Sequence, residues 1–349
     1  AHEGFDAATA ELDPAQAGAA LRAAFAACEA TGLEAFGVWT AGDVETAIAS
    51  TAGTRAADRV TDAYMKVIAR DPGGRSGWGA GMASAAGVLD PDAIARRAAA
   101  KVAREEPATL EPGAYPVVLE AAAVGWLLDF LGALAFNGLA HAEGRGALAG
   151  RLGTRVASPA INLSDSPRYP ATLPRAFDLE GVPKAPLPLI QDGVAHRVVH
   201  DTRSAARAGD GARSTGHAVT PGGAPDGPHP TNLVLLGGGA SDAEELAAPI
   251  ERGIHVTRLW YLNVVHAKST LLTGTTRDGT FLIEDGRITR PLRDVRFTDS
   301  VLRILEHTEA LSAAQRLTGE ADFYGRRFAR GVVCPALRAQ GFRITGAST

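Results

Sequence analysis

One apolar run sets the strongest constraint on how this chain can fold. Residues 117–136 form the most apolar window of the sequence, yet they contain two carboxylates, Glu120 and Asp129. A charge at the centre of a bilayer is costly, so the run is better explained as a buried helix than as a membrane span. We therefore predict a strand over residues 115–120, followed by a long core helix over residues 122–136.

The segments before this run predict a separate α/β unit. Asp13-Pro14 and Asp90-Pro91 each place an N-cap carboxylate before a proline at the first helical position. Strand-like segments, including two short ones over residues 35–40 and 44–50, lie between the two predicted helices. Composition changes near Pro107 and Pro112, where we place a domain boundary. We predict an N-terminal domain over residues 1–108 and a larger β-rich domain over residues 109–349, which is an α+β chain.

The second domain contains many short extended runs. Asp192-Gly193 and Asp285-Gly286 lie between such runs and predict tight hairpin turns. We also expect a helical stretch around residues 144–152 and a last helix over residues 299–317. The glycine-rich segment 209–230 is too long for a plain connection, and loops of this length are usually functional or disordered.

Charge and cysteine content narrow the classes of function. The 349 residues include 35 basic and 39 acidic side chains, a net charge of −4, so no basic field favours nucleic acid. Cys28 and Cys334 are too few for a disulfide framework. The chain starts at Ala1 without methionine or a signal-peptide pattern. We expect a cytoplasmic protein that does not enter membranes, and a start that is processed or truncated.

A search for familiar catalytic motifs finds none. None of the nine histidines lies in a His-Glu-x-x-His pattern. His196 and His200 lie in a strand-like context, where four residues span ~13 Å, so they could not share a metal. There is no Gly-x-Ser-x-Gly motif, and the apolar context of Cys334 predicts a buried thiol.

Five segments, taken in order, resemble a known family. They are residues 111–120 (EPGAYPVVLE), 150–159 (GRLGTRVASP), 232–238 (NLVLLGG), 251–254 (ERGI) and 274–288 (GTTRDGTFLIEDGRI). In this order and spacing the chain resembles the TldD/PmbA family, also called modulators of DNA gyrase. The resemblance covers nearly the whole chain and is strongest after residue 110. It implies that residues 1–108 correspond to the later part of the family's first domain.

The resemblance implies a cytosolic metallopeptidase built as a dimer, often of two related subunits. The TldD-type subunit carries His-Glu-x-x-x-His on a helix, with a distal cysteine as a further zinc ligand, whereas the PmbA or TldE-type subunit lacks them. Such assemblies degrade or trim small peptides. The expected partners are therefore a TldD-type homologue or a second copy of this chain, together with a peptide substrate.

The motif position decides which subunit the chain resembles. Counting back without gaps from Val156 places the motif on residues 129–134, so Asp129, Phe130 and Leu134 occupy its three functional positions. Phenylalanine cannot act as a general base and leucine cannot bind zinc. Cys334 comes later than the distal cysteine is expected. The chain therefore resembles the PmbA side, with no catalytic residues and no metal of its own, and zinc is expected only in a TldD-type partner.

A segment of the glycine-rich loop is the candidate for contact with substrate. It comprises Arg213, Ser214, Thr215, Gly216 and His217. The arginine could meet a peptide carboxylate, whereas the alternative is a solvated surface loop.

Three functions remain open from the sequence. The first is a non-catalytic partner subunit of a metallopeptidase, which would be inactive alone. The second is an independent hydrolase that uses His217 with Asp210, or His141 with Glu143. The third is a binding or regulatory protein without enzymatic activity.

Overall fold

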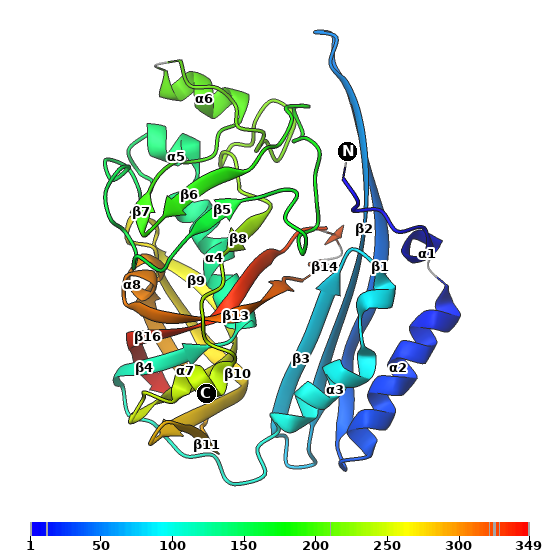
Figure 1. Ribbon diagram of the computed structural model, residues 1–349, viewed down its shortest axis with the longest axis vertical. Coiled ribbons are helices and arrows are strands. Elements are labelled where there is room, and N and C mark those ends of the chain that lie inside the picture. The colour runs from blue at the N-terminus through cyan, green and yellow to red at the C-terminus, as the bar shows by residue number, and fades with distance from the viewer. Residues whose placement is uncertain are drawn as a thin grey trace.

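The computed structural model describes residues 2–11, 13–209, 211–320, 322–323, 326–327 and 329–347. Its strands form a three-stranded sheet in the N-terminal part and a larger sheet in the C-terminal part. Figure 1 shows the two parts side by side, joined at the bottom of the view by the segment before β4 (Gly113–Leu119). The predicted α+β fold, with a smaller N-terminal part and a β-rich C-terminal part, is confirmed.

The N-terminal sheet is an antiparallel meander. It contains β1 (Glu34–Ala49), β2 (Arg55–Arg70) and β3 (Ser76–Ala83), in that order. Where the sequence predicts two short strands, residues 35–40 and 44–50, the chain forms the single strand β1, because β2 pairs with it along its whole length. Figure 1 shows this hairpin running nearly the full height of the molecule.

The two predicted capped helices are present, and they cover one face of this sheet. They are α2 (Pro14–Glu29) and α3 (Pro91–Ala100); α1 (Ala7–Glu11) and the short turn η1 (Ala86–Val88) complete this part. Asp13 accepts a hydrogen bond from Ala15 N at 2.8 Å, and Asp90 accepts one from Ala93 N at 3.0 Å. Both prolines stand at the start of their helices, where the missing N–H costs nothing.

The C-terminal part is organised around the predicted apolar helix. This helix is α4 (Ala121–Ala135), and it is preceded by the predicted strand β4. Leu127, Leu128 and Leu131 are almost completely buried in the main core. Of the helices in the described ranges, none has both the length and the apolar character that crossing a bilayer requires.

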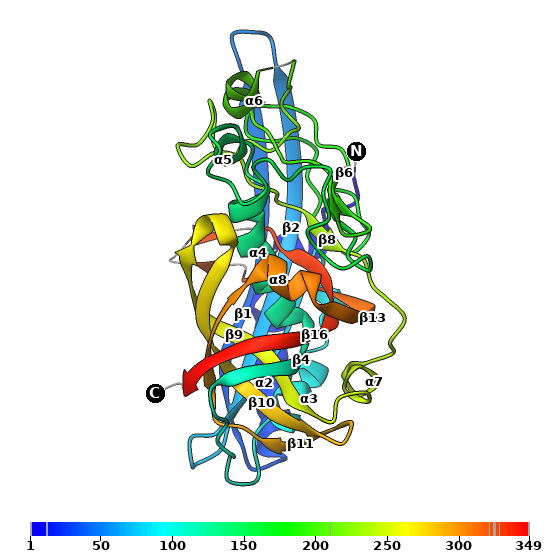
Figure 2. The same ribbon diagram turned by 90° about the vertical axis from the view of Figure 1, so that its left-hand side faces the viewer.

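The large sheet has the strand order β11-β10-β9-β4-β16-β8-β5-β6-β7, with β12 and β13 paired beside it. Figure 2 shows β4 and β16 side by side across the lower half of the molecule, with β9 and β10 next to them. The strands after β4 are β5 (Leu163–Asp165), β6 (Leu187–Gln191), β7 (Val194–Ala195), β8 (Leu233–Leu235), β9 (Arg252–His266), β10 (Leu271–Glu284), β11 (Arg287–Pro291), β12 (Val295–Ser300), β13 (Thr308–Thr318) and β16 (Val332–Ala347).

The small elements complete the C-terminal part. They are the helices α5 (Gly138–Ala142), α6 (Thr202–Ala208), α7 (Ala243–Ala247) and α8 (Val301–Glu306), the turn η2 (Ala267–Ser269), and the two-residue strands β14 (Asp322–Phe323) and β15 (Arg326–Arg327). Both predicted hairpin turns are present, because Asp192, Gly193, Asp285 and Gly286 all have the positive φ angles that tight turns need.

Two helix predictions are wrong. Residues 299–317 contain only the six-residue helix α8, and β13 follows it, because these residues pair with β16. Residues 144–152 form successive turns rather than a helix. Their glycines at 144 and 150 have φ of 72° and 73°, which a helix cannot contain.

Candidate functional site

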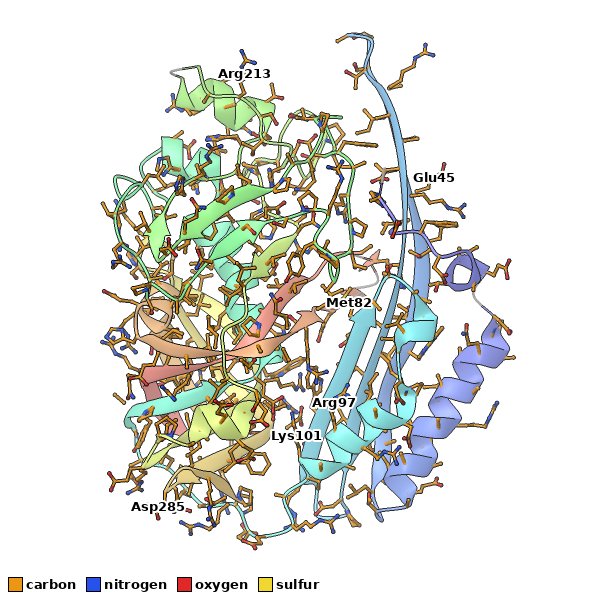
Figure 3. The ribbon with its side chains drawn as sticks, in the orientation of Figure 1. Glu45, Met82, Arg97, Lys101, Arg213 and Asp285 are labelled. Carbon is orange, nitrogen blue, oxygen red and sulfur yellow. The ribbon has the colours of Figure 1, made fainter. Side chains whose placement is uncertain are left out.

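A cleft of about 830 Å³ lies between the N-terminal and C-terminal parts of the chain. The strand β3 and the helix α3 line one side of it, and α4 and β13 line the other. Figure 3 labels Met82, Arg97 and Lys101 where α3 and β3 face the larger part. No single segment of the sequence forms this cleft, because its walls come from residues more than two hundred positions apart.

The α4 wall of the cleft is both apolar and charged. Trp126, Asp129 and Phe130 lie on one face of the helix because their spacing of three and four residues matches its turn. The rings of Trp126 and Phe130 stack with their centroids 6.3 Å apart. The candidate motif position therefore faces the cleft, and its carboxylate stands beside an aromatic surface.

Asp129 has two partners, one on each carboxylate oxygen. His229 Nε2 lies 3.4 Å from one carboxylate oxygen, and Arg330 lies 3.6 Å from the other. Burial alone would raise the pKa of Asp129, but the His229 hydrogen bond and the Arg330 charge outweigh it, so the pKa falls below its usual value. The side chain, 38% exposed, is therefore a carboxylate near neutral pH and already has partners within this chain.

The residues at the motif positions do not fit a zinc ion. Phe130 has no lone pair to offer, and Leu134 packs against the main core. Burial raises the pKa of Cys334 to about 12, and its thiol donates to Ala121 O at 3.2 Å. Within the described ranges, no three His, Cys, Asp or Glu side chains come together as metal ligands would. Asp129 alone supplies too few ligand atoms to hold a zinc ion.

Glu120 joins the two halves of the chain at the floor of the cleft. It precedes α4 and accepts a hydrogen bond from Lys101, at the end of α3, at 2.6 Å. His255 Nε2 of β9 lies 3.1 Å from its other oxygen. Burial alone would raise the pKa of Glu120, but Lys101 and His255 outweigh this effect, so the pKa falls to about 2.

A buried ion pair fixes β3 against the large sheet. Arg258 of β9 pairs with Asp278 of β10, and both side chains are buried. Asp278 also accepts a hydrogen bond from Ser76 of β3, and the Arg258 guanidinium lies over the rings of Trp78 and Trp260. These contacts hold the two walls of the cleft in a defined arrangement.

The predicted substrate segment 213–217 does not line this cleft. Figure 3 places Arg213 beside α6 at the top of the molecule, well away from Arg97 and Lys101. Ser214 and Thr215 donate to the carbonyl of His200 at 3.2 and 3.1 Å. A substrate role for this segment stays a prediction, and in this structure it concerns a surface separate from the cleft.

His217 is buried beside the ion pair of Asp165 and Lys184. It is 1% exposed, and its Nε2 lies 3.2 Å from Asp165, which also pairs with Lys184 at 3.0 Å. Lys184 donates in addition to the carbonyl of Gly216 at 3.3 Å. This histidine therefore helps to anchor the loop and does not face solvent. Asp210, its suggested partner, lies outside the described residues.

The sequence alone does not predict that basic residues gather in the cleft. Arg97, Lys101, Arg316 and Arg330 all line it, yet they stand on separate elements and belong to no motif. The scarcity of lysine offers a weak signal, because Lys101 and Lys184 are two of only four lysines and both form ion pairs.

Comparison with known proteins agrees with this architecture. Residues 6–105 match the model of the PmbA/TldA metallopeptidase central domain, and residues 112–346 match that of the C-terminal domain. The chain belongs to the PmbA/TldD family of metallopeptidases, so the resemblance seen in its sequence is confirmed.

Individual relatives support the same family. A metalloprotease from Methanothermobacter thermautotrophicus is 25% identical over 236 residues, which is 65% of this chain and 49% of that protein. A metalloprotease TldD homolog from Haemophilus influenzae is 25% identical over 242 residues, 67% of this chain and 48% of that protein. The chain thus spans about half the length of these curated relatives.

Solved structures share the fold. TldE from Thermococcus kodakarensis superposes with a TM-score of 0.84 at 22% identity, covering 99% of this chain and 77% of that one. A protein from Thermotoga maritima described as a modulator of a DNA gyrase gives a TM-score of 0.85 at 21% identity, with the same coverage. At this level of identity, the likeness shows a common fold.

Proposed function

We propose that this chain is a non-catalytic, TldE/PmbA-like subunit of a TldD/TldE-type metallopeptidase complex that processes peptides. One observation carries the proposal: the cleft is present, but Phe130 and Leu134 stand where a metallopeptidase of this family needs a general base and a zinc ligand. The zinc and the hydrolytic chemistry then belong to a TldD-type partner, and this chain binds peptide and completes the assembly.

The shape of the cleft supports a peptide ligand. Its volume of about 830 Å³ lies within the range of sites that bind small molecules and short peptides. β3 is the last strand in the order of its sheet, and Gly79 and Gly81 in it line the cleft. An extended peptide can add to such an edge through main-chain hydrogen bonds, which tolerate many sequences.

The proposal also covers the cell compartment and the oligomeric state. Cys28 and Cys334 are both free and buried, which suits a reducing compartment, and we propose the cytoplasm. The complex is a dimer with a TldD-type homologue, and a dimer of two copies of this chain is the alternative arrangement.

Co-expression tests this function directly. The protein is purified alone and together with a TldD-type homologue that carries His-Glu-x-x-x-His, and cleavage of an unstructured peptide is measured for each sample. We expect no cleavage by the protein alone, co-purification of the two subunits, and cleavage by the pair that exceeds that of the homologue alone. Full activity of the protein alone would refute the proposal.

The independent-hydrolase alternative gains no specific support from the geometry. His217 contacts Asp165 inside the protein, as described above. His141 is on α5, and Glu143, which follows that helix, pairs with Arg145 at 2.6 Å. Thr215 Oγ1 lies 2.9 Å from His217 Nδ1, but this imidazole is only 1% exposed and its other nitrogen faces Asp165, so the histidine is closed off from solvent. For the regulatory alternative, the net charge of −4 gives no specific support to DNA binding.

A further inference from the structure

The charges that line the cleft are not balanced pair by pair. Among the described residues, five carboxylates line the cleft, and all five have partners within the chain. Asp90 and Asp242 cap helices, Glu120 binds Lys101 and His255, Asp129 binds His229 and Arg330, and Glu320 lies 3.9 Å from Lys66. These carboxylates are therefore committed to internal contacts.

Two arginines of the cleft lack such a carboxylate partner in the described ranges. Arg97 on α3 makes one hydrogen bond, to the carbonyl of Ala80 at 3.2 Å. Arg316 on β13 lies opposite Cys334 in the sheet, and no described carboxylate pairs with its guanidinium. Arg97 is half-buried, whereas Arg316 is exposed at the edge of the cleft. Guanidinium groups kept together without a counter-ion are poorly explained as structural elements, because like charges repel.

These arginines are close enough to disturb one another. Burial lowers the pKa of Arg97, and the charge of Arg316 lowers it further. Burial also lowers the pKa of Lys101, and both arginines add to this effect although Glu120 opposes it. Of these three cations, Lys101 is hydrogen-bonded to Glu120, whereas Arg97 and Arg316 have no such bond to a carboxylate among the described residues. Their guanidinium groups can therefore donate to an anionic ligand in the cleft. An anionic group placed there would relieve the repulsion.

The surroundings indicate what kind of anion fits. Trp126 and Phe130 form an aromatic wall in the same cleft, and Leu89 and Ile94 add apolar surface beside Arg97. A guanidinium binds a carboxylate through two parallel hydrogen bonds. A ligand that presents a carboxylate next to apolar side chains would match both features. The C-terminus of a peptide is such a group.

We propose that Arg97 and Arg316 bind the C-terminal carboxylate of a peptide ligand, and that the last side chains of the peptide pack against Trp126 and Phe130. This inference rests on the proposed function and specifies its ligand: the cleft selects free peptide C-termini over internal segments of a chain. The complex would then act on short peptides and on chain ends.

Calorimetric binding of two probes tests the inference. N-acetyl-Ala-Ala-Phe is titrated as the free acid and as the C-terminal amide, into the purified protein and into its complex with a TldD-type homologue. A hydrogen-bonded charge contributes about 1.5–3 kcal/mol, so the acid should bind roughly 10- to 150-fold more tightly than the amide. Arg97→Gln and Arg316→Gln should bring this ratio close to one.

Control variants separate recognition from folding. Arg293→Gln removes an exposed arginine that pairs with Glu106 outside the cleft, and it should leave the ratio unchanged. Arg97→Lys and Arg316→Lys keep the charge but lose the two-pronged geometry, and should retain part of the preference. If the glutamine variants unfold, the ratio of acid to amide affinity in the lysine variants still tests the inference.

Each remaining outcome counts against the inference. Equal affinity for acid and amide, or a preference that survives both glutamine substitutions, would overturn it. So would the absence of binding, or binding of inorganic phosphate that depends on both arginines while the peptide acid does not bind. The co-expression experiment is independent: if the pair still forms and cleaves peptides, only the carboxylate site fails and the proposed function stands.

Discussion

We predict that the substitution Lys184→Met lowers the free energy of unfolding much more than the position of this residue in a long loop region suggests. Lys184 and Asp165 are 2% and 0% exposed, and their charged atoms lie 3.0 Å apart. Removal of the cation leaves the Asp165 carboxylate buried with only the His217 contact and the Asn232 N–H, at 2.8 Å, to stabilise it. Breaking a buried pair in this way costs about 3–5 kcal/mol.

Urea denaturation, followed by circular dichroism, measures this loss. The matched control is Lys268→Met, since Lys268 is exposed and donates only to the carbonyl of Gly144; it should change stability by less than about 0.5 kcal/mol. In the double variant Asp165→Asn/Lys184→Met the two losses should fall short of additivity by about 1–3 kcal/mol, because both substitutions remove the same pair. A Lys184→Met loss below about 1 kcal/mol, or full additivity, would refute this account of the cluster.

Three further predictions concern the core, the cleft and a turn. Phe297→Ala should cost about 3–5 kcal/mol in thermal or urea unfolding, because the side chain is fully buried; a loss under about 1 kcal/mol would contradict the packing described. Because the folded pKa of Glu120 is about 2 and its ordinary value is 4.5, its contribution is complete above pH 4.5 and is lost as the pH falls towards 2. That contribution is ~3 kcal/mol, so Glu120→Gln should flatten the fall of stability over this range, and an unchanged pH profile would refute the pairing with Lys101. Gly193→Ala should destabilise the hairpin, since φ is 76° and a Cβ would lie 2.2 Å from the carbonyl of Ala157; unchanged melting would argue against this turn.

Local signals predicted much of the fold. The strand and helix around residues 115–136, the two proline-started helices and the two Asp-Gly turns were all visible, because capping, apolar runs and turn chemistry act within a few residues. The helix predicted over residues 299–317 failed for the opposite reason. Its alanines and leucines favour helix locally, but pairing with β16 outweighs that preference.

The cleft could not be predicted from such local signals. Arg97 and Arg316 are 219 positions apart, and only the packing of α3 near β13 brings them to one site. The motif position was accessible to sequence reasoning, because one helix carries it and the neighbouring family segments fix its register. The loop with His217 shows the converse: a glycine-rich segment attracts attention, although its histidine serves to anchor it.

The central claim is that this chain supplies no metal ligands and depends on a TldD-type partner for zinc. Elemental analysis of the purified protein and of its complex measures this most directly. We predict no stoichiometric zinc in the protein alone and one zinc per pair in the complex, which Asp129→Ala in this chain leaves in place. One zinc per molecule of the protein alone, lost on Asp129→Ala, would contradict the account.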